Sequence, residues 1–273
     1  MRVFRRIRFL PLAALSVFAL SLAAADAPHA ALDRDHIEEF LLNARVIRSQ
    51  RIGKGITNPY RLTLTDGTTT HDAAFQPVDE RRNFKQFADG TTEINYVDSY
   101  RYNIAAYRLA VLLGLENMMP VTVERKWNGM IGSLSWWLDV QMDEKERYEK
   151  EIRPPDVEAY NRQVYKVRVF AELVYDTDRN IGNMLIGKNW EVYMIDFSRA
   201  FRLYRQIKDA RNLERCSRDL LARLERLTLD SLMNATKGFL TEDEAKAVIT
   251  RRDLIVEHFS GLVAEKGEEA VLY

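Results

Sequence analysis

The sequence has a single cysteine, Cys216, among its 273 residues, which excludes a disulfide within the chain. Its four histidines (His29, His36, His71 and His258) lack the spacing of a zinc site. The pattern G-x-S-x-G, which marks the nucleophile of many esterases, does not occur, and the chain contains no internal repeat or low-complexity tract. These absences argue against a disulfide-stapled scaffold, a zinc module and an esterase of that class.

The chain also lacks an excess of positive charge. It carries 40 lysines and arginines against 40 aspartates and glutamates. Residues 1–25 hold four arginines and no acid, so without them the net charge is −4. A net acidic chain is not a general nucleic-acid binder, and we expect no nucleic-acid partner. Hydrophobic residues make up 47%, which suits one large domain or two packed lobes.

Residues 1–25 have the layout of a secretory signal peptide. Four arginines lie within the first eight residues, residues 9–25 are uncharged, and Ala23 and Ala25 are small residues before a cleavage point. The sequence therefore predicts an exported protein, periplasmic or extracellular. The alternative is an uncleaved anchor, which would be the only contact with a membrane.

The next stretch alternates between strand and helix patterns. Residues 26–44 suggest a linker and a short helix that begins at Asp33 or Asp35. Residues 45–78 predict antiparallel strands, first broken at Gly53-Lys54-Gly55. Residues 98–114 predict a helix, and residues 121–140 predict a hairpin that turns at Asn128-Gly129. Together, residues 45–140 are expected to form a β-rich N-lobe.

Residues 141–273 are expected to form a mostly helical C-lobe. A long helix should run from Asp156 through Tyr175, followed by helical runs over residues 203–235 and 241–264. Thr241 and Glu244 have the spacing of a capping box. The order of sheet, helix, sheet and then helices predicts an α+β fold with two lobes.

The chemistry concentrates in residues 175–201, YDTDRNIGNMLIGKNWEVYMIDFSRAF. Asn183 follows Asp178 by five positions, the interval of a kinase catalytic loop. A hairpin turning at Lys188-Asn189 would fold Asp196 back beside Asn183. Phosphoryl transfer needs an acid to orient the attacking hydroxyl and oxygen ligands to hold metal ions. Carboxylate and amide oxygens are the ligands that Mg²⁺ prefers.

This segment resembles the atypical kinases related to phosphoinositide kinases, which include secretory-pathway kinases and HipA-like bacterial kinases. The residues D-R-N-I-G-N resemble their catalytic loop, and M-I-D-F-S-R-A-F is similar to their metal-binding loop. The segments NIAAYRLAVLLGL and MPVTVER extend the similarity upstream, to uncharacterised exported bacterial proteins of this group. The resemblance implies a two-lobed protein-kinase-like fold. It also implies that Asp178 is catalytic, that Asn183 and Asp196 bind Mg²⁺ or Mn²⁺, and that Gly53, Lys54 and Gly55 cover the ATP phosphates.

The sequence departs from this family at one ion pair. The family's phosphate-contacting lysine is matched by Gln76, and its acidic partner on the following helix by Asn103. Lys54 could reach the phosphates instead, or Lys85 and Glu93 could supply the pair under another alignment of the strands. Without either, transfer would be slow or absent.

Two other features have more than one interpretation. Trp136-Trp137 could line a purine pocket or belong to the ordinary core. Residues 202–226 hold eight basic and four acidic residues, which is either a solvated helix face or a basic rim for an anionic substrate.

Three functional hypotheses follow. The first is an exported kinase-like phosphotransferase that uses ATP and Mg²⁺ or Mn²⁺ on an unknown acceptor, whether protein, sugar or lipid head group. The second is a pseudokinase that binds nucleotide or acts as a scaffold in the cell envelope. The third is a metal-binding structural domain without nucleotide.

Overall fold

The computed structural model describes residues 33–53, 59–87 and 89–273 of the chain. The predicted signal peptide and the linker up to residue 32 lie outside these residues. Helix α1 (Arg34–Asn43) begins at Asp33, because the Oδ1 atom of Asp33 accepts the backbone N–H of His36 at 2.9 Å. Phe40 and Leu41 form its buried side. The short helix expected from the sequence is therefore present.

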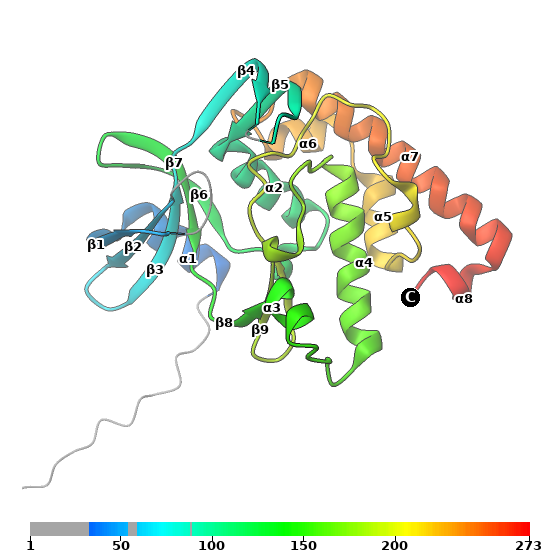
Figure 1. Ribbon diagram of the computed structural model, residues 1–273, viewed down its shortest axis with the longest axis horizontal. Coiled ribbons are helices and arrows are strands. Elements are labelled where there is room, and N and C mark those ends of the chain that lie inside the picture. The colour runs from blue at the N-terminus through cyan, green and yellow to red at the C-terminus, as the bar shows by residue number, and fades with distance from the viewer. Residues whose placement is uncertain (1–32, 54–58, 88) are drawn as a thin grey trace, which may run out of the picture. The chain divides into compact units, whose positions relative to one another are not determined.

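A five-stranded antiparallel sheet follows, in the order β1-β2-β3-β7-β6 (Figure 1). Its strands are β1 (Arg45–Arg51), β2 (Tyr60–Thr65), β3 (Thr70–Gln76), β6 (Thr122–Trp127) and β7 (Met130–Trp136). Leu62, Leu64, Ala73 and Phe75 are fully buried, as the alternation of the two predicted strands requires. Helix α1 contacts β6 and β7 of this sheet.

Helix α2 (Tyr100–Leu112) connects the sheet to the helical part of the chain. Ser99 caps it, since its Oγ accepts the backbone N–H of Arg101 at 3.3 Å. Gly114 follows the helix with a φ of +68°, a conformation that glycine adopts without strain. The helix packs against β6 and β7 on one side and α6 on another. The helix therefore contacts both the N-lobe sheet and the C-lobe.

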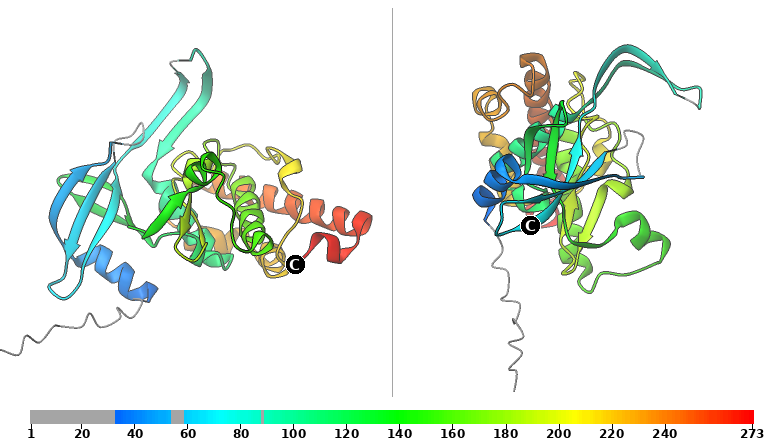
Figure 2. Two further views of the ribbon diagram at one scale, coloured as in Figure 1. Left: turned by 60° about the horizontal axis from the view of Figure 1, so that its bottom comes forward. Right: turned by 90° about the vertical axis from the view of Figure 1, so that its left-hand side faces the viewer.

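A two-stranded ribbon of β4 (Asp79–Gln86) and β5 (Thr92–Ser99) precedes α2, and the sequence pattern did not predict it. Figure 2 shows the ribbon extending away from the five-stranded sheet. Phe84 and Ile94 are opposite each other on its strands, and both are largely exposed. The sequence DERRNFKQ lacks the alternation of a half-buried strand, because only one end of the ribbon packs on the protein.

The C-terminal half is mostly helical. A small antiparallel sheet, in the order β10-β9-β8, joins β8 (Val140–Asp143), β9 (Met184–Gly187) and β10 (Val192–Met194). The helices are α3 (Glu144–Glu149), α4 (Val157–Leu173), α5 (Arg218–Arg226), α6 (Leu229–Ala235), α7 (Glu242–Lys266) and α8 (Glu268–Val271). In the described part of the chain, 3₁₀ turns form at Ile181–Asn183 and Ala210–Asn212, and at Glu116–Met118 after α2. The predicted α+β fold, with a β-rich N-lobe and a helical C-lobe, is confirmed. The predicted boundary between residues 140 and 141 lies at the start of β8.

The helix expected from residue 203 begins only at Arg218. Residues 203–217 form a loop with one 3₁₀ turn, and some of their backbone N–H groups bond to distant partners. The buried carboxylate of Glu172 on α4 accepts the backbone N–H groups of Lys208 (2.8 Å) and Asp209 (3.2 Å). The N–H of Cys216 donates to the carbonyl of Val271 at 3.0 Å. Burial raises the pKa of the Cys216 thiol to about 12, in keeping with an inert thiol.

The N-cap predictions in the C-lobe are confirmed at two helices. Asp156 caps α4, which ends at Leu173 rather than Tyr175. Thr241 and Glu244 form the capping box of α7. None of the helices in the described part of the chain is long and apolar enough to cross a membrane.

Candidate functional site

The loop that follows α4 carries Asp178, whose backbone is fixed by hydrogen bonds. The carboxylate of Asp176 is fully buried, and its Oδ1 accepts the backbone N–H of Asp178 at 3.0 Å. The Asp178 carbonyl accepts the side-chain N–H groups of Asn180 (3.2 Å) and Asn183 (3.1 Å). The Asp178 residue itself is exposed, and within the described residues nothing hydrogen-bonds to its carboxylate. The backbone of Asp178 is therefore held in place, and its carboxylate is open to a reacting hydroxyl.

Arg179 ties this loop to the segment that contains Asp196. Its Nε and Nη2 atoms bind the Asp176 carboxylate at 2.8 and 2.7 Å. The same guanidinium donates to the carbonyls of Asn183 (3.0 Å), Ile195 (2.9 Å) and Asp196 (2.9 Å). Only 10% of the Arg179 side chain is exposed. A planar fork of five donors suits this task, which a lysine could not perform.

The predicted hairpin brings Asn183 and Asp196 together. Strands β9 and β10 pair so that Met184 is opposite Met194, and the backbone N–H of Ile195 donates to the carbonyl of Asn183 at 3.1 Å. The Nδ2 of Asn183 donates to Asp178, which leaves its Oδ1 available as a ligand. Asp196 has a φ of +57°, an uncommon conformation that aspartate tolerates and that occurs at functional sites.

The charges of two other carboxylates, Asp98 and Asp176, act on Asp196. Solvent reaches this residue, yet protein crowds its carboxylate, and the resulting desolvation raises the pKa of Asp196 above its ordinary value. A hydrogen bond from Ser198 opposes this rise, the charge of Asp98 adds to it, and weaker contributions from Arg179 and Asp176 oppose each other. A carboxylate in this environment is stabilised in its charged form by a cation.

Asp98 was not among the predicted site residues. It is 6% exposed, and its Oδ1 is buried without a hydrogen-bond partner in the described structure. Its Oδ2 accepts the hydroxyl of Tyr96 at 3.2 Å. The next residue, Ser99, donates its backbone N–H to the carbonyl of Ser198 at 2.8 Å, which fixes the end of β5 against the segment after Asp196. No motif distinguishes Asp98 from a helix cap, so no signal in the sequence pointed to it.

The donor set suits a hard divalent cation. Asn183 and Asp196 offer an amide and a carboxylate oxygen, and the buried Asp98 oxygen has no protein partner in the described structure. No group of three histidine, cysteine, aspartate or glutamate side chains in the described ranges is arranged to hold a metal by itself. Mg²⁺ is commonly held by one or two carboxylates together with substrate phosphates.

Gln76 and Asn103 lie in contact, where the resemblance had aligned them with the family's ion pair. The Nδ2 of Asn103 on α2 donates to the Oε1 of Gln76 at the end of β3 over 2.6 Å. The Oδ1 of Asn103 accepts the backbone N–H of Phe197 at 2.7 Å. An uncharged amide pair thus links the N-lobe sheet, α2 and the residue after Asp196. Such a pair avoids leaving a lone buried charge.

Gly132 allows the sheet to close around Gln76. A Cβ atom at Gly132 would lie 2.5 Å from the backbone oxygen of Gln76 and 2.9 Å from the Cα of Pro77. Strand β7 can therefore approach β3 this closely only with glycine at this position. The isolated glycine in the predicted strand MIGSLSW was the sequence signal for this contact.

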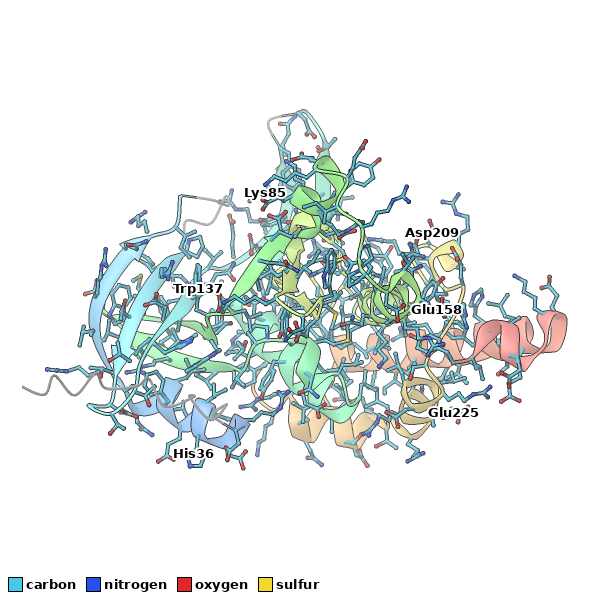
Figure 3. The ribbon with its side chains drawn as sticks, turned by 90° about the horizontal axis from the view of Figure 1, so that it is seen from below. His36, Lys85, Trp137, Glu158, Asp209 and Glu225 are labelled. Carbon is cyan, nitrogen blue, oxygen red and sulfur yellow. The ribbon has the colours of Figure 1, made fainter. Side chains whose placement is uncertain are left out.

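The proposed replacement pair of Lys85 and Glu93 does not form an ion pair at the site. The two residues are opposite each other on the β4–β5 ribbon, where Figure 3 labels Lys85. Lys85 instead binds Glu80 at 3.4 Å and lies over the Tyr96 ring at 3.9 Å. Glu93 pairs with Arg199 and Arg202.

Other residues considered from the sequence have these positions. Gly53 is exposed at the end of β1, and the N–H of Ile52 donates to the carbonyl of Pro59 at 2.8 Å, which closes the base of the loop. Lys54 and Gly55 lie outside the described residues. Trp136 stacks on His71 with ring centroids 3.5 Å apart, and Trp137 lies under Arg61 at 4.3 Å.

Comparison with known proteins gives a clear result only at the level of structure. No protein-family model and no curated sequence matches the chain. Hydra Fam20, solved with sugar, superposes with a TM-score of 0.63 at 16% identity over 87% of this chain and 91% of that chain. The Golgi casein kinase with Mn/ADP bound gives 0.65 at 13% identity over 88% and 78%, and the Helicobacter pylori proinflammatory kinase CtkA gives 0.51 at 12% over 83% and 98%.

The chain has the fold of an atypical, secretory-pathway-type kinase. The expected resemblance is thus confirmed at the level of the fold. In this kinase-like fold, Asp178, Asn183 and Asp196 occupy one region organised by Arg179. The supporting pair of Asp176 and Arg179 was missed as a structural unit, although both residues lie within the motif.

Proposed function

We propose that this protein is an atypical kinase-like phosphotransferase that moves the γ-phosphate of ATP to a hydroxyl acceptor with the help of Mg²⁺ or Mn²⁺. The main observation behind the proposal is that Arg179 and its partner Asp176 bind the backbone of all three motif residues. Its guanidinium binds the carbonyls of Asn183 and Asp196, and its partner Asp176 holds the backbone of Asp178. The kinase-like fold supplies the context for this arrangement.

Each residue has a definite role in this proposal. The exposed Asp178 carboxylate would accept or orient the proton of the attacking hydroxyl, which a positioned carboxylate can do. Asn183 and Asp196 would hold the divalent ion through their oxygen atoms. That ion, when bound, supplies positive charge to the β- and γ-phosphates. The loop of Gly53, Lys54 and Gly55 would cover these phosphates.

For the acceptor, we propose only its chemical class. Solved neighbours of this fold contain a sugar in one case and Mn/ADP in another. They support nucleotide with a divalent metal as ligands, and a protein, sugar or lipid head group as acceptor. Export through residues 1–25 would fit the Golgi named for one of these neighbours, and the acceptor would then lie outside the cytoplasm.

A pseudokinase is the second candidate, and one observation favours it. The pair of Gln76 and Asn103 is uncharged, so no lysine contacts the phosphates from the end of β3. In kinases such a lysine and its acidic partner position the phosphates for transfer. Binding without transfer would follow if Lys54 does not compensate.

Nucleotide binding can be tested by thermal unfolding of the purified protein with and without ATP and Mg²⁺ or Mn²⁺. A ligand at 100 times its dissociation constant adds about 2.7 kcal/mol of stability. We expect a metal-dependent shift in the parent protein and none in Asp196→Ala. A shift that persists in Asp196→Ala would contradict the assigned metal ligand. The absence of any shift with nucleotide would reject both candidates, and a response to metal alone would leave a structural metal domain.

Transfer is then tested with ATP labelled at the γ-phosphate. The readouts are incorporation into the protein itself and into protein, sugar and lipid acceptors. Asp178→Ala is the matched control, since its exposed side chain makes no hydrogen bond within the described structure. Transfer that Asp178→Ala abolishes supports the phosphotransferase. Nucleotide binding without transfer to any of these acceptors supports the pseudokinase.

A further inference from the structure

A cavity lies apart from the residues of the site already described. It has a volume of about 350 Å³ and is formed by the β4–β5 ribbon, residues 201–204 and the start of α7. None of the residues Gln76, Asn103, Asp178, Asn183 and Asp196 lines it. Volumes of about 300–1,000 Å³ are typical of small-molecule sites in proteins. The cavity is therefore large enough for a small organic ligand.

The charged side chains of this cavity favour an anion. Arg81, Arg82 and Arg202 line it together with one acid, Glu244, while the acids that pair with Arg82 and Arg202, Glu80 and Glu93, are not in the wall. A lining of this charge matches a dianion such as a phosphate monoester. Guanidinium groups bind phosphate through two parallel hydrogen bonds, which gives geometric selectivity as well as affinity.

The deepest of the three arginines is held in position by the protein. The Arg202 side chain is 5% exposed, pairs with Glu93, and donates to the carbonyl of Asn95 at 3.1 Å. Asn95 has a φ of +55° within β5, an uncommon conformation for a strand residue. Asn95 therefore has this uncommon backbone conformation and also accepts the hydrogen bond from Arg202, and it lies on the wall of the cavity.

Arg81 is also oriented before any ligand arrives. Its Nη1 lies 3.3 Å from Glu244, and its Nη2 donates to the hydroxyl of Tyr102 at 3.3 Å. That hydroxyl in turn donates to Glu244 at 2.5 Å. Arg82, by contrast, is 60% exposed and pairs only with Glu80 among the described residues, and Glu80 is not in the cavity wall. Arg82 is therefore the least constrained of the three arginines.

We propose that this cavity binds a small organic phosphate, with the phosphate between the three arginines. The remaining wall includes Tyr96, Tyr204, Asn83 and Asn95, residues that offer both polar and apolar groups to a sugar or similar group. The site does not depend on the proposed kinase activity. It lies next to the metal loop in sequence, since Arg202 follows Asp196 by six positions.

The test measures binding of ribose 5-phosphate and inorganic phosphate to the purified protein by calorimetry, without nucleotide or divalent metal. Uncharged ribose is the ligand control. Arg82→Gln is the diagnostic variant, because this side chain is exposed and its loss should not affect folding. Arg226→Gln, an exposed arginine in the last turn of α5, is the matched variant with the same change of charge.

Both phosphates should bind and ribose should not. Arg82→Gln should weaken ribose 5-phosphate binding about tenfold, the scale of one charge-assisted contact, while Arg226→Gln should leave it unchanged. Affinity should fall as salt is raised. No binding at millimolar phosphate ester, or equal affinity in the parent and Arg82→Gln, would overturn the proposal. Failure of the ATP and metal assays would leave this result unaffected, so the two proposals can fail separately.

Discussion

Arg179→Met should be among the most destabilising single changes in the C-lobe. The substitution leaves the Asp176 carboxylate, which is fully buried, without its counter-charge. Breaking one partner of a buried ion pair costs about 3–5 kcal/mol. The carbonyls of Asn183, Ile195 and Asp196 also lose a charged donor. We expect the free energy of unfolding to fall by about 4 kcal/mol, a large share of the roughly 5–15 kcal/mol of a typical domain.

Urea denaturation, followed by tryptophan fluorescence and circular dichroism, measures this loss. The double variant Asp176→Asn/Arg179→Met removes both charges, while the introduced amide keeps an oxygen for the N–H of Asp178. A favourable coupling of about 2 kcal/mol should appear in the double-mutant cycle. Lys246→Met is the control, because Lys246 pairs with Glu242 on an exposed face of α7 and its loss should leave the midpoint unchanged. A loss below about 1 kcal/mol for Arg179→Met, or additive effects in the cycle, would refute the reasoning.

Three further predictions concern the same region. Gln76→Lys and Asn103→Glu should each destabilise the protein. The double variant should recover about 1–2 kcal/mol of stability, because the two side chains are 2.6 Å apart in the parent and the new charges can pair. Additive unfolding free energies in urea would contradict this. Without metal, Asp196→Asn should be more stable than the parent at pH 7. The pKa of Asp196 is raised in the folded protein, so the parent loses stability as the pH rises through that pKa, whereas the variant does not. This gap should close as pH falls toward the ordinary value of 3.8, so a gap in thermal midpoint that is independent of pH would be evidence against it. Gly132→Ala should cost about 2 kcal/mol in urea denaturation because its Cβ meets the Gln76 backbone, whereas Gly261→Ala in α7, with open space around it, should be neutral or stabilising.

The local part of the candidate site could be predicted because its geometry is set by nearby residues. The interval from Asp178 to Asn183 fits one loop, and the pairing of β9 with β10 folds Asp196 back to Asn183. Both depend on turns and strands that lie close together in the chain. The same holds for the caps at Asp33, Asp156 and Thr241, where a side chain bonds to a backbone group three positions on.

Features that depend on distant partners were missed or misjudged. Residues 203–217 have the composition of a helix, but Glu172 on α4 captures their backbone N–H groups. The sequence of β4 lacks strand alternation, because its partner is only β5. Arg199, which follows Asp196 by three positions, pairs with the distant Glu93 on the ribbon.

The sequence by itself determined the α+β order of elements, the helix caps, and the short-range spacing of Asp178, Asn183 and Asp196. These follow from periodicity, capping and short-range spacing, which any segment carries within itself. The tertiary structure alone decided that the charge of Asp98 acts on Asp196, that Gly132 makes room for Gln76, and that three arginines line one cavity. Each of these joins residues from separate elements, and their meeting depends on how the sheet, the ribbon and the helices pack.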